Sequence, residues 1–528
     1  MKRKSFFSLL IALSMATPIT APAQQGLREI DSFLTQMHAG GKFNGGVMIA
    51  EKGQVIYTKF CGMADIARNI PNGPDSRFDI ASVSKTFTAV AILQLMEKGR
   101  LKLDDPFARY FPEFPYPAVT VRQMLTHTSG IPDEFHLFSP ITDKYPDSIL
   151  RNQDLIGILR SSGKPLEFTP GEHWHYCNTN FELLALLVEK LSGEPFAEYI
   201  RRHIFSPAHM NNSYIISDLR PADPQAVTRY VRPYYYSRDY VNADSVKSGR
   251  FAMNAYGGTV GDNNVVSTLG DLLKYDQALY GDVLLRPQTL RQAFAPQPLK
   301  DGSLNYDHPG DPGHPPASYG LGWFVATDSS DRKPVSAGNK SDNSTDKIVY
   351  HGGYNPGAST MIYRDLTRRR TIVFFDNTND DHFYPTMAIA AWLDGKRPPA
   401  QWAFAFDLKR SIAREYGAEL LEKGEDAALL RLLTLQKDTA HYYLSRRELS
   451  LVGYELLQAG RKDLGFAPFR ANLFLFPHDA ASFGNYGIVL ADNGKKEEAI
   501  AVYRMALSEH PDDKTITGLL QKELGAAR

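Results

Sequence analysis

The segment from residue 83 to residue 98 constrains the fold of this chain more than any other. Its apolar side chains fall on nearly every side of a helix, and Gly99 follows as a stop. These side chains are Val83, Phe87, Val90, Ala91, Ile92, Leu95 and Met96. A helix without a polar face is buried on all sides. Other elements must therefore surround it, and 528 residues of 43% hydrophobic content are enough to build such a core.

Two pairs of β-rich runs lie far apart in the chain. Residues 45–50 and 54–60 flank a Lys52-Gly53 turn, and residues 359–363 and 371–375 flank a basic turn. Helical patterns lie between the two pairs. This order predicts an α+β (mixed α/β) fold, with a sheet that joins both ends of one large domain.

Capping-box patterns predict where two of the intervening helices begin. Thr120 is followed by Gln123, and Thr179 is followed by Glu182 and a run of apolar residues at helical spacing. We expect a helix to start at each place and the second to stop at Gly193.

The chain changes character near Lys396-Arg397-Pro398-Pro399, beyond which helical patterns dominate. This predicts a large domain over residues 24–398 and a helical extension over 399–528. In the extension, similar residues recur 34 positions apart: Gly453 and Gly487, Gly460 and Gly494, Phe469 and Tyr503, Leu473 and Leu507, Pro477 and Pro511. The period resembles the tetratricopeptide repeat, with two repeats over about 446–528 that pack on residues 408–445 or on the rest of the chain. The extension either contacts a protein partner or packs and binds nothing.

The N-terminus carries the pattern of a secretory signal peptide over residues 1–23. Lys2, Arg3 and Lys4 precede a short apolar run, and Ala21-Pro22-Ala23 is a small-x-small cleavage site. The run is too short to span a bilayer, and no cysteine follows it. We expect cleavage after Ala23 and a periplasmic or secreted protein without a stable membrane anchor.

Charge and cysteine content exclude several classes of function. The 59 basic residues equal the 59 acidic ones, and removal of residues 1–23 leaves a formal charge of −3, which argues against nucleic-acid binding. With two cysteines, Cys61 and Cys177, the chain has neither a disulfide scaffold nor a cysteine-rich metal site. We therefore expect no metal and no cofactor, and the pairing of the two cysteines stays open.

Ser82 and Lys85 stand at positions i and i+3 at the start of the buried helix, so both side chains lie on one face. A serine hydroxyl needs a base to become a nucleophile, and a neighbouring lysine can serve. A helix start also directs backbone N–H groups at a developing oxyanion. Ser84 is adjacent to Lys85 and faces elsewhere. The motif is weak alone, because it arises often by chance.

Four further stretches in the same order make the pattern specific. Tyr176-Cys177-Asn178 matches Y-x-N, His351-Gly352-Gly353 matches H-x-G, and residues 125–131 read L-T-H-T-S-G-I. Residues 258–272 contain Val265-Val266-Ser267-Thr268 before Asp271-Leu272. With Ser82 and Lys85, these stretches resemble the class C-like branch of the serine β-lactamase and penicillin-binding-protein superfamily over residues 27–395. The resemblance implies an antiparallel sheet flanked by helices, with a helical subdomain.

The resemblance also implies residue roles. Ser82 would be acylated, Lys85 would lower the pKa of Ser82 and shuttle a proton, and Tyr176 would act as general base and then as acid. Asn178 would hydrogen-bond Lys85 and the acyl side of the substrate.

The third motif supplies the remaining supporting residues. His351 would polarise or orient the substrate, and Gly353 would support it. The backbone N–H groups of Ser82 and Tyr354 would form the oxyanion hole.

Histidine replaces the motif lysine of dedicated β-lactamases and D,D-peptidases, and is cationic only below about pH 6.5. The favoured function is therefore a serine hydrolase cleaving an ester or amide, as an esterase or a D-amino-acid-type peptidase. A penicillin-binding D,D-peptidase or class C-like β-lactamase is the alternative, so the partner is a small-molecule ester, peptide or β-lactam. From another class, the chain could be a non-catalytic binding protein that uses its helical tail.

Overall fold

The computed structural model describes residues 21–145, 148–216, 229–235, 241–242, 258–307, 317–327, 347–378, 382–399 and 409–525. Most of the predicted leader, residues 1–20, lies outside the described residues. So do residues 400–408, next to the predicted domain boundary.

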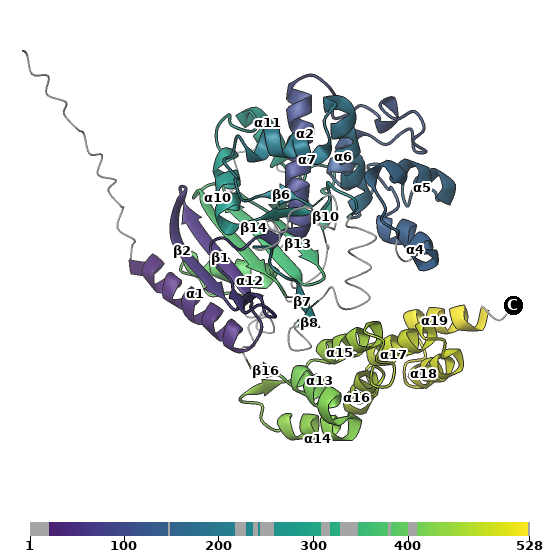
Figure 1. Cartoon of the computed structure of the whole chain (residues 1–528). Coiled ribbons are helices and arrows are strands. Elements are labelled where there is room, and N and C mark those ends of the chain that lie inside the picture. Colours follow the sequence, from purple (N-terminus) through teal and green to yellow (C-terminus); the bar gives the residue numbers. More distant parts are fainter. Residues whose placement is uncertain are drawn as a thin grey trace, which may run out of the picture.

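An eight-stranded antiparallel sheet forms the centre of the large domain (Figure 1), in the order β10-β11-β12-β13-β14-β15-β1-β2. The strands are β1 (Gly45–Glu51), β2 (Gln54–Cys61), β10 (Tyr306–Asp307), β11 (Ala317–Tyr319), β12 (Phe324–Ala326), β13 (Ile348–Asn355), β14 (Ala358–Asp365) and β15 (Arg370–Asp376). β1 pairs with β15, Glu51 opposite Arg370. The expectation that the sheet joins both ends of one domain is therefore confirmed.

Alternate residues of the strands enter two different apolar cores, as the twofold period of a strand requires. Val47 and Ile372 pack under α1 (Ala21–Ala39) and α12 (Phe383–Leu393), whereas Val373 faces the core around α2 (Ser84–Glu97). Further helices enclose α2: α3 (Val121–Leu125), α4 (Glu134–Lys144), α5 (Leu155–Ser162), α6 (Asn178–Ser192), α7 (Phe196–Ile200), α10 (Leu269–Ala278) and α11 (Pro287–Ala293). A small sheet completes this side: β5 (Phe78–Asp79), β9 (Val265–Ser267) and β6 (Tyr214–Ile215).

α2 is buried around its whole circumference, as its sequence predicts. Every residue from 84 to 95 is buried, and Gly99 takes a left-handed φ of +69° just after the helix. The nucleophile motif therefore begins a helix that the surrounding core holds rigidly.

The structure confirms one capping box and overturns the other. Thr120 and Gln123 cap α3 reciprocally. The prediction at Thr179 is wrong, because α6 begins at Asn178, whose N–H donates to Asp133 Oδ2 over 2.7 Å. A carboxylate from a distant segment supplies the cap, and Glu182 is buried instead.

Helices make up most of the extension: α13 (Ile412–Lys423), α14 (Glu425–Leu435), α15 (Arg446–Gln458), α16 (Ala467–Leu475), α17 (Ala480–Asp492), α18 (Lys496–Glu509) and α19 (Lys514–Gly525). The first residues of α13, α15, α17 and α19 lie 34 positions apart. A Cβ on Gly453 would lie 2.3 Å from the Phe469 ring, and one on Gly487 would lie 2.1 Å from the Tyr503 ring. The glycine and aromatic positions of the sequence repeat therefore contact each other, once in each copy.

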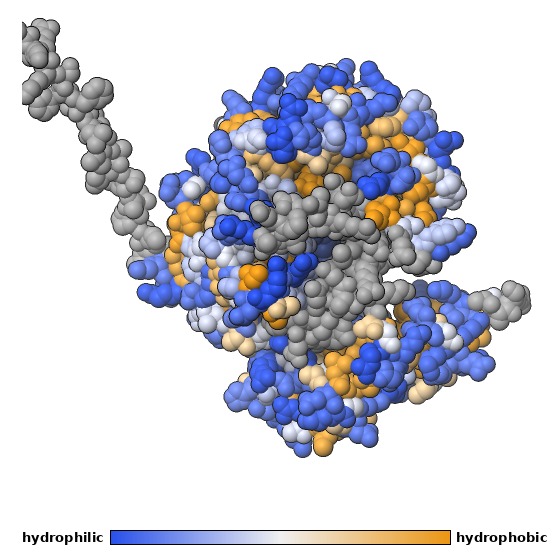
Figure 2. Space-filling view, viewed as in Figure 1, coloured by the Kyte–Doolittle hydropathy of each residue, from blue (hydrophilic) through white to orange (hydrophobic). Residues whose placement is uncertain are grey.

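Polar residues cover most of the visible surface of the described parts (Figure 2). Within these parts, no helix is both long and apolar enough to cross a membrane. Cys61 and Cys177 are buried and form no disulfide.

Candidate active site

A short 3-10 turn over Ala81–Val83 places the half-buried Ser82 just before α2. Ala81 takes a left-handed φ of +45°, which costs energy for a residue with a side chain. Asp79 holds the turn: its Oδ1 accepts from Ala81 N–H over 2.8 Å, and its Oδ2 accepts from Asn355 Nδ2 over 3.1 Å. The end of β13 thus fixes the nucleophile turn.

The ammonium of Lys85 lies between the nucleophile and a buried loop. Its Nζ donates to Ser82 Oγ over 3.1 Å and to the Asp262 carbonyl oxygen over 3.0 Å. Lys85 is completely buried. The hydroxyl of Ser84 instead accepts from Val265 N–H over 3.1 Å. Of these two serines, Ser82 is therefore the one that Lys85 contacts.

Tyr176 lies beside this pair, with its ring centroid 5.0 Å from Lys85 Nζ. Burial raises the pKa of the Tyr176 phenol, although Lys85 opposes the rise. Burial alone would lower the pKa of Lys85, but Tyr176, which ionises only at high pH, and the Asp262 carboxylate hold it above its ordinary value. The resting site therefore contains an ammonium beside a neutral phenol at neutral pH.

His127 supports the ring of Tyr176. The two rings stack with centroids 4.3 Å apart and planes 29° apart. Cys177 N–H donates to His127 Nδ1 over 3.0 Å, so the ring proton is on Nε2. Burial holds the pKa of His127 well below its usual value, so the ring is neutral.

Asn178 differs from the expectation that it would bond Lys85. Its Nδ2 donates to Glu134 Oε1 over 3.0 Å, and its Oδ1 is buried without a hydrogen-bond partner. α6 begins two residues earlier than the predicted Thr179 cap implies, and the Asn178 amide meets Glu134 at the start of α4. Asn178 Oδ1 is therefore an acceptor without a partner, in a side chain bonded to Glu134.

His351 was expected to polarise or orient the substrate without a permanent charge. It is completely buried, and its Nδ1 lies 2.7 Å from the Gly352 carbonyl oxygen. A carbonyl only accepts, so Nδ1 carries the proton and Nε2 accepts from the Tyr319 hydroxyl over 2.9 Å. Burial lowers the pKa of His351 to about 3. This position therefore offers a neutral, hydrogen-bonded ring.

Gly353 lies where strand β13 passes the nucleophile turn. A Cβ there would come within 2.4 Å of the Ile80 carbonyl oxygen and 2.9 Å of Ser82 N. Only glycine allows this approach, which brings the backbone of residues 353–354 beside the backbone N–H of Ser82. Tyr354 follows with an exposed side chain.

A buried acidic cluster adjoins these residues, and the sequence reasoning missed it. Oxygens of Glu134, Glu182 and Asp262 lie within 4.8 Å of one another, and no side chain of the three is more than 2% exposed. Burial raises the pKa of all three, to about 8 for Glu182 and about 6 for Asp262. Such oxygens can bind a hard metal ion or another cation. The sequence signal that could have indicated this cluster is Glu182, an acidic residue inside an otherwise apolar helical run.

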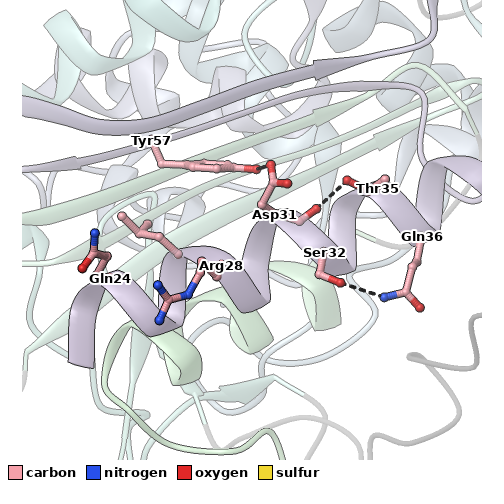
Figure 3. Close-up of a pocket in the computed structure, with 8 residues that line it drawn as sticks. Gln24, Arg28, Asp31, Ser32, Thr35, Gln36 and Tyr57 are labelled. Carbon is pink, nitrogen blue, oxygen red and sulfur yellow. Dashed lines mark hydrogen bonds between the residues drawn. The ribbon is translucent and has the colours of Figure 1, made fainter. Parts of the chain in front are cut away.

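A hollow of about 590 Å³ lies along α1, beside Tyr57 of β2 (Figure 3). The Tyr57 hydroxyl donates to Asp31 Oδ1 over 2.9 Å. α1 belongs to the core on the opposite face of the sheet from α2. This hollow is therefore separate from the Ser82 site.

Known proteins are similar to this chain in sequence and in fold. Residues 30–396 match the family described as Beta-lactamase. Penicillin-binding protein 4* of Bacillus subtilis is 34% identical over 355 residues, which are 66% of this chain and 71% of that protein. A penicillin-binding protein structure from Bacillus halodurans is 26% identical, with a TM-score of 0.54, over 68% of this chain and 99% of that one. A D-amino acid amidase structure from Ochrobactrum anthropi SV3 is 21% identical, with a TM-score of 0.51, over 70% of this chain and 96% of that one, and supports the fold alone. The match over more than half of the sequence establishes that the chain belongs to the β-lactamase family, within the serine β-lactamase and penicillin-binding-protein superfamily.

Proposed function

We propose that the protein is an exported serine hydrolase that cleaves an ester or amide through an acyl-enzyme on Ser82. The 3.1 Å hydrogen bond between Lys85 Nζ and Ser82 Oγ, with the Tyr176 ring centroid 5.0 Å from the same Nζ, is the observation that carries this proposal. Both groups that could act as a base therefore lie at the start of the helix that carries Ser82.

The protonation states of Lys85 and Tyr176 determine the order of the chemical steps. One proton must leave the Lys85–Tyr176 pair before the pair can accept the Ser82 proton, because the resting pair is fully protonated. Ser82 Oγ then bonds to the acyl carbon, and the pair returns the proton to the leaving alcohol or amine as its bond to carbon breaks. Water later adds to the acyl carbon and releases Ser82. Backbone N–H groups of Ser82 and Tyr354 would stabilise the oxyanion in both steps.

The substrate choice rests on His351 and on the relatives. A neutral His351 favours esterase or D-amino-acid-type peptidase activity, because it offers no cation for a substrate carboxylate. The similarity to penicillin-binding protein 4* favours a penicillin-reactive D,D-peptidase or β-lactamase as the second candidate.

Intact mass spectrometry tests the proposal and separates these candidates. The full chain is incubated with a fluorophosphonate and, separately, with a fluorescent penicillin. We expect a fluorophosphonate adduct that Ser82→Ala abolishes, with Ser84→Ala as the matched control that still reacts. A penicillin adduct that persists indicates the peptidase, and one that turns over indicates the β-lactamase. A folded chain that reacts with neither probe contradicts the catalytic proposal and favours a non-catalytic binding protein.

The helical extension and the leader add two proposals. The 34-residue spacing of α13, α15, α17 and α19 supports tetratricopeptide-like repeats that contact a protein partner. Deletion of residues 400–528 should leave the hydrolysis of small esters intact. Export after cleavage at Ala23 predicts a mature N-terminus at Gln24, which N-terminal sequencing of the periplasmic or secreted fraction can detect.

A further inference from the structure

His127 follows helix α3 in a backbone conformation that glycine adopts at less cost. Its φ is +56°, in the left-handed region, and it comes directly after Thr126, the C-cap of α3. Its N–H donates to the Met124 carbonyl oxygen over 3.3 Å. The next N–H, of Thr128, donates to the Gln123 carbonyl oxygen over 2.9 Å. These two bonds form a Schellman motif, in which glycine usually occupies the position of His127. A side chain at this position therefore points to a role of its own.

His127 holds both residues that flank Tyr176. His175 N–H donates to the His127 carbonyl oxygen over 3.0 Å. Cys177 N–H donates to His127 Nδ1, also over 3.0 Å. Between these two bonds the imidazole stacks on the Tyr176 ring, with centroids 4.3 Å apart. Tyr176 itself lies in the loop before α6, outside the helices and strands. Contacts from His127 therefore fix both the backbone and the ring of Tyr176.

Two further rings hold the imidazole in place. Phe181 of α6 lies with its centroid 5.1 Å from that of His127, and Tyr319 of β11 lies 4.7 Å from it. The Tyr319 hydroxyl in turn bonds His351 of β13. His127 therefore connects Tyr176 to the sheet and to the helix that follows it.

The imidazole of His127 is not itself a base for Ser82. Its Nδ1 lone pair accepts from Cys177, and its Nε2 carries the proton. Nε2 has no hydrogen-bond partner among the described residues, and His127 is completely buried. The ring therefore has no free lone pair for the Ser82 proton, which leaves positioning as the role of the side chain.

The precision of Tyr176 matters because a general base works only within hydrogen-bond reach of the proton that it takes. A displacement of about 1 Å can slow a reaction about 100-fold. The phenol of Tyr176 must also stay in place while it loses and regains a proton.

We propose that His127 is the positioning residue for Tyr176, holding the phenol beside Ser82 and Lys85 through the hydrogen bond to Cys177 N–H and the ring stack. The inference rests on the acyl-enzyme function proposed above. It adds a residue of the 125–131 stretch that acts through Tyr176 alone.

Three variants separate the two contacts. His127→Leu removes both. His127→Phe keeps a ring but leaves Cys177 N–H without its acceptor, and His127→Asn keeps an acceptor and suits the left-handed backbone but loses the stack. The full chain is treated with a fluorophosphonate at increasing concentrations, and intact mass gives the maximal rate of modification and the concentration for half of that rate. His127→Leu should lower the maximal rate by at least about 100-fold without changing that concentration. Phe and Asn should each lower the rate less.

His209 is the matched control, because it has a left-handed φ of +57° and is exposed. His209→Leu and His209→Asn should leave both quantities unchanged. In a Tyr176→Phe background, His127→Leu should cause no further loss, because the phenol that it positions is gone. A normal rate in His127→Leu, or an undiminished loss in the Tyr176→Phe background, would overturn the positioning role.

Nitration by tetranitromethane measures the hold on Tyr176 without any catalysis. Peptide mass spectrometry gives the fraction of Tyr176 nitrated after a fixed time. His127→Leu should raise this fraction several-fold over the wild type, because a phenol that is no longer held opens to solvent more often. His209→Leu should not. If His127→Leu does not fold, His127→Asn is compared in its place.

The two measurements distinguish the two proposals. A wild type that does not react with the fluorophosphonate contradicts the catalytic proposal, and the nitration of Tyr176 then decides the positioning role. Unchanged nitration in the His127 variant overturns that role in either case.

Discussion

The neutral ring of His351 makes the stability of the large domain depend on pH in a calculable way. Burial lowers the pKa of His351 from 6.5 to about 3 in the folded protein. Below pH 6.5 the unfolded chain therefore binds a proton here that the folded chain does not bind. The contribution to the free energy of unfolding is complete above pH 6.5 and is lost as the pH falls toward 3. At pH 5, about 1.5 units below 6.5, the loss is about 2 kcal/mol.

Urea unfolding of the wild type and of His351→Gln at pH 7 and pH 5 measures this loss. Three of the four tryptophans, at positions 174, 323 and 392, lie in the large domain, and Trp402 lies at the start of the extension. In a Trp402→Phe background, tryptophan fluorescence therefore reports on the large domain alone. Between pH 7 and pH 5 the wild type should lose about 2 kcal/mol more than His351→Gln. Val349→Ala, at an equally buried site on β13, should be destabilised by the same amount at both pH values. If His351→Gln and the wild type show the same dependence on pH, the assignment of a neutral buried ring is refuted.

Three further perturbations test other parts of the structure. Gly353→Ala forces a Cβ against the backbone of the nucleophile turn and should slow ester hydrolysis by at least about 100-fold. Gly484→Ala, which has open space around it, should leave the rate unchanged. Normal activity of Gly353→Ala would contradict the close approach of the two backbones. Arg364→Met leaves the fully buried Asp276 without its ion-pair partner and should lower the free energy of unfolding, measured in urea, by about 3–5 kcal/mol. The double variant with Asp276→Leu should recover most of this loss. If the losses of the two single variants add in the double variant, the pairing is contradicted. Gly487→Ala drives a Cβ into the Tyr503 ring and should lower the melting temperature of the helical extension, measured by circular dichroism. The unfolding transition of the large domain, measured by tryptophan fluorescence, should not change. A shift of the tryptophan signal would show that the two regions unfold together.

The sequence analysis correctly predicted the elements that depend on residues close together in the sequence. The buried helix after Ser82, the turn at Lys52-Gly53 and the Thr120 capping box all depend on side chains within a few positions, and each is present in the structure. A sheet that joins the two ends of the domain was also predicted, and the structure makes this join by pairing β1 with β15.

Contacts between distant segments were beyond the sequence reasoning. Asp133 caps α6, Glu134 takes the amide of Asn178, and Asp262 reaches Lys85 from a loop far along the chain. Nothing local indicates these partners. The role expected for Asn178 differed for this reason, and the acidic cluster went unnoticed.

The helical extension shows how a repeat can hide in a sequence. Residues 446–528 were recognised from paired glycines and aromatic residues. α13 begins 34 positions before α15, yet Glu419 stands where Gly453 and Gly487 stand in the later helices, and Leu435 stands in the place of the aromatic ring. The first helix pair keeps the spacing without the side chains that reveal it.

The pairing of β1 with β15 has a consequence for the order of folding. The ion pair between Glu51 and Arg370 joins positions 319 residues apart, and closing a loop of this length costs about 3 kcal/mol more than closing one of ten residues. Until β15 has been synthesised, β1 has an unpaired edge that can join another chain. The turn that carries Ser82 also packs against β13, so it reaches its final geometry only in the same late step. An unfinished chain of this protein therefore carries the nucleophile but lacks the assembled machinery to use it.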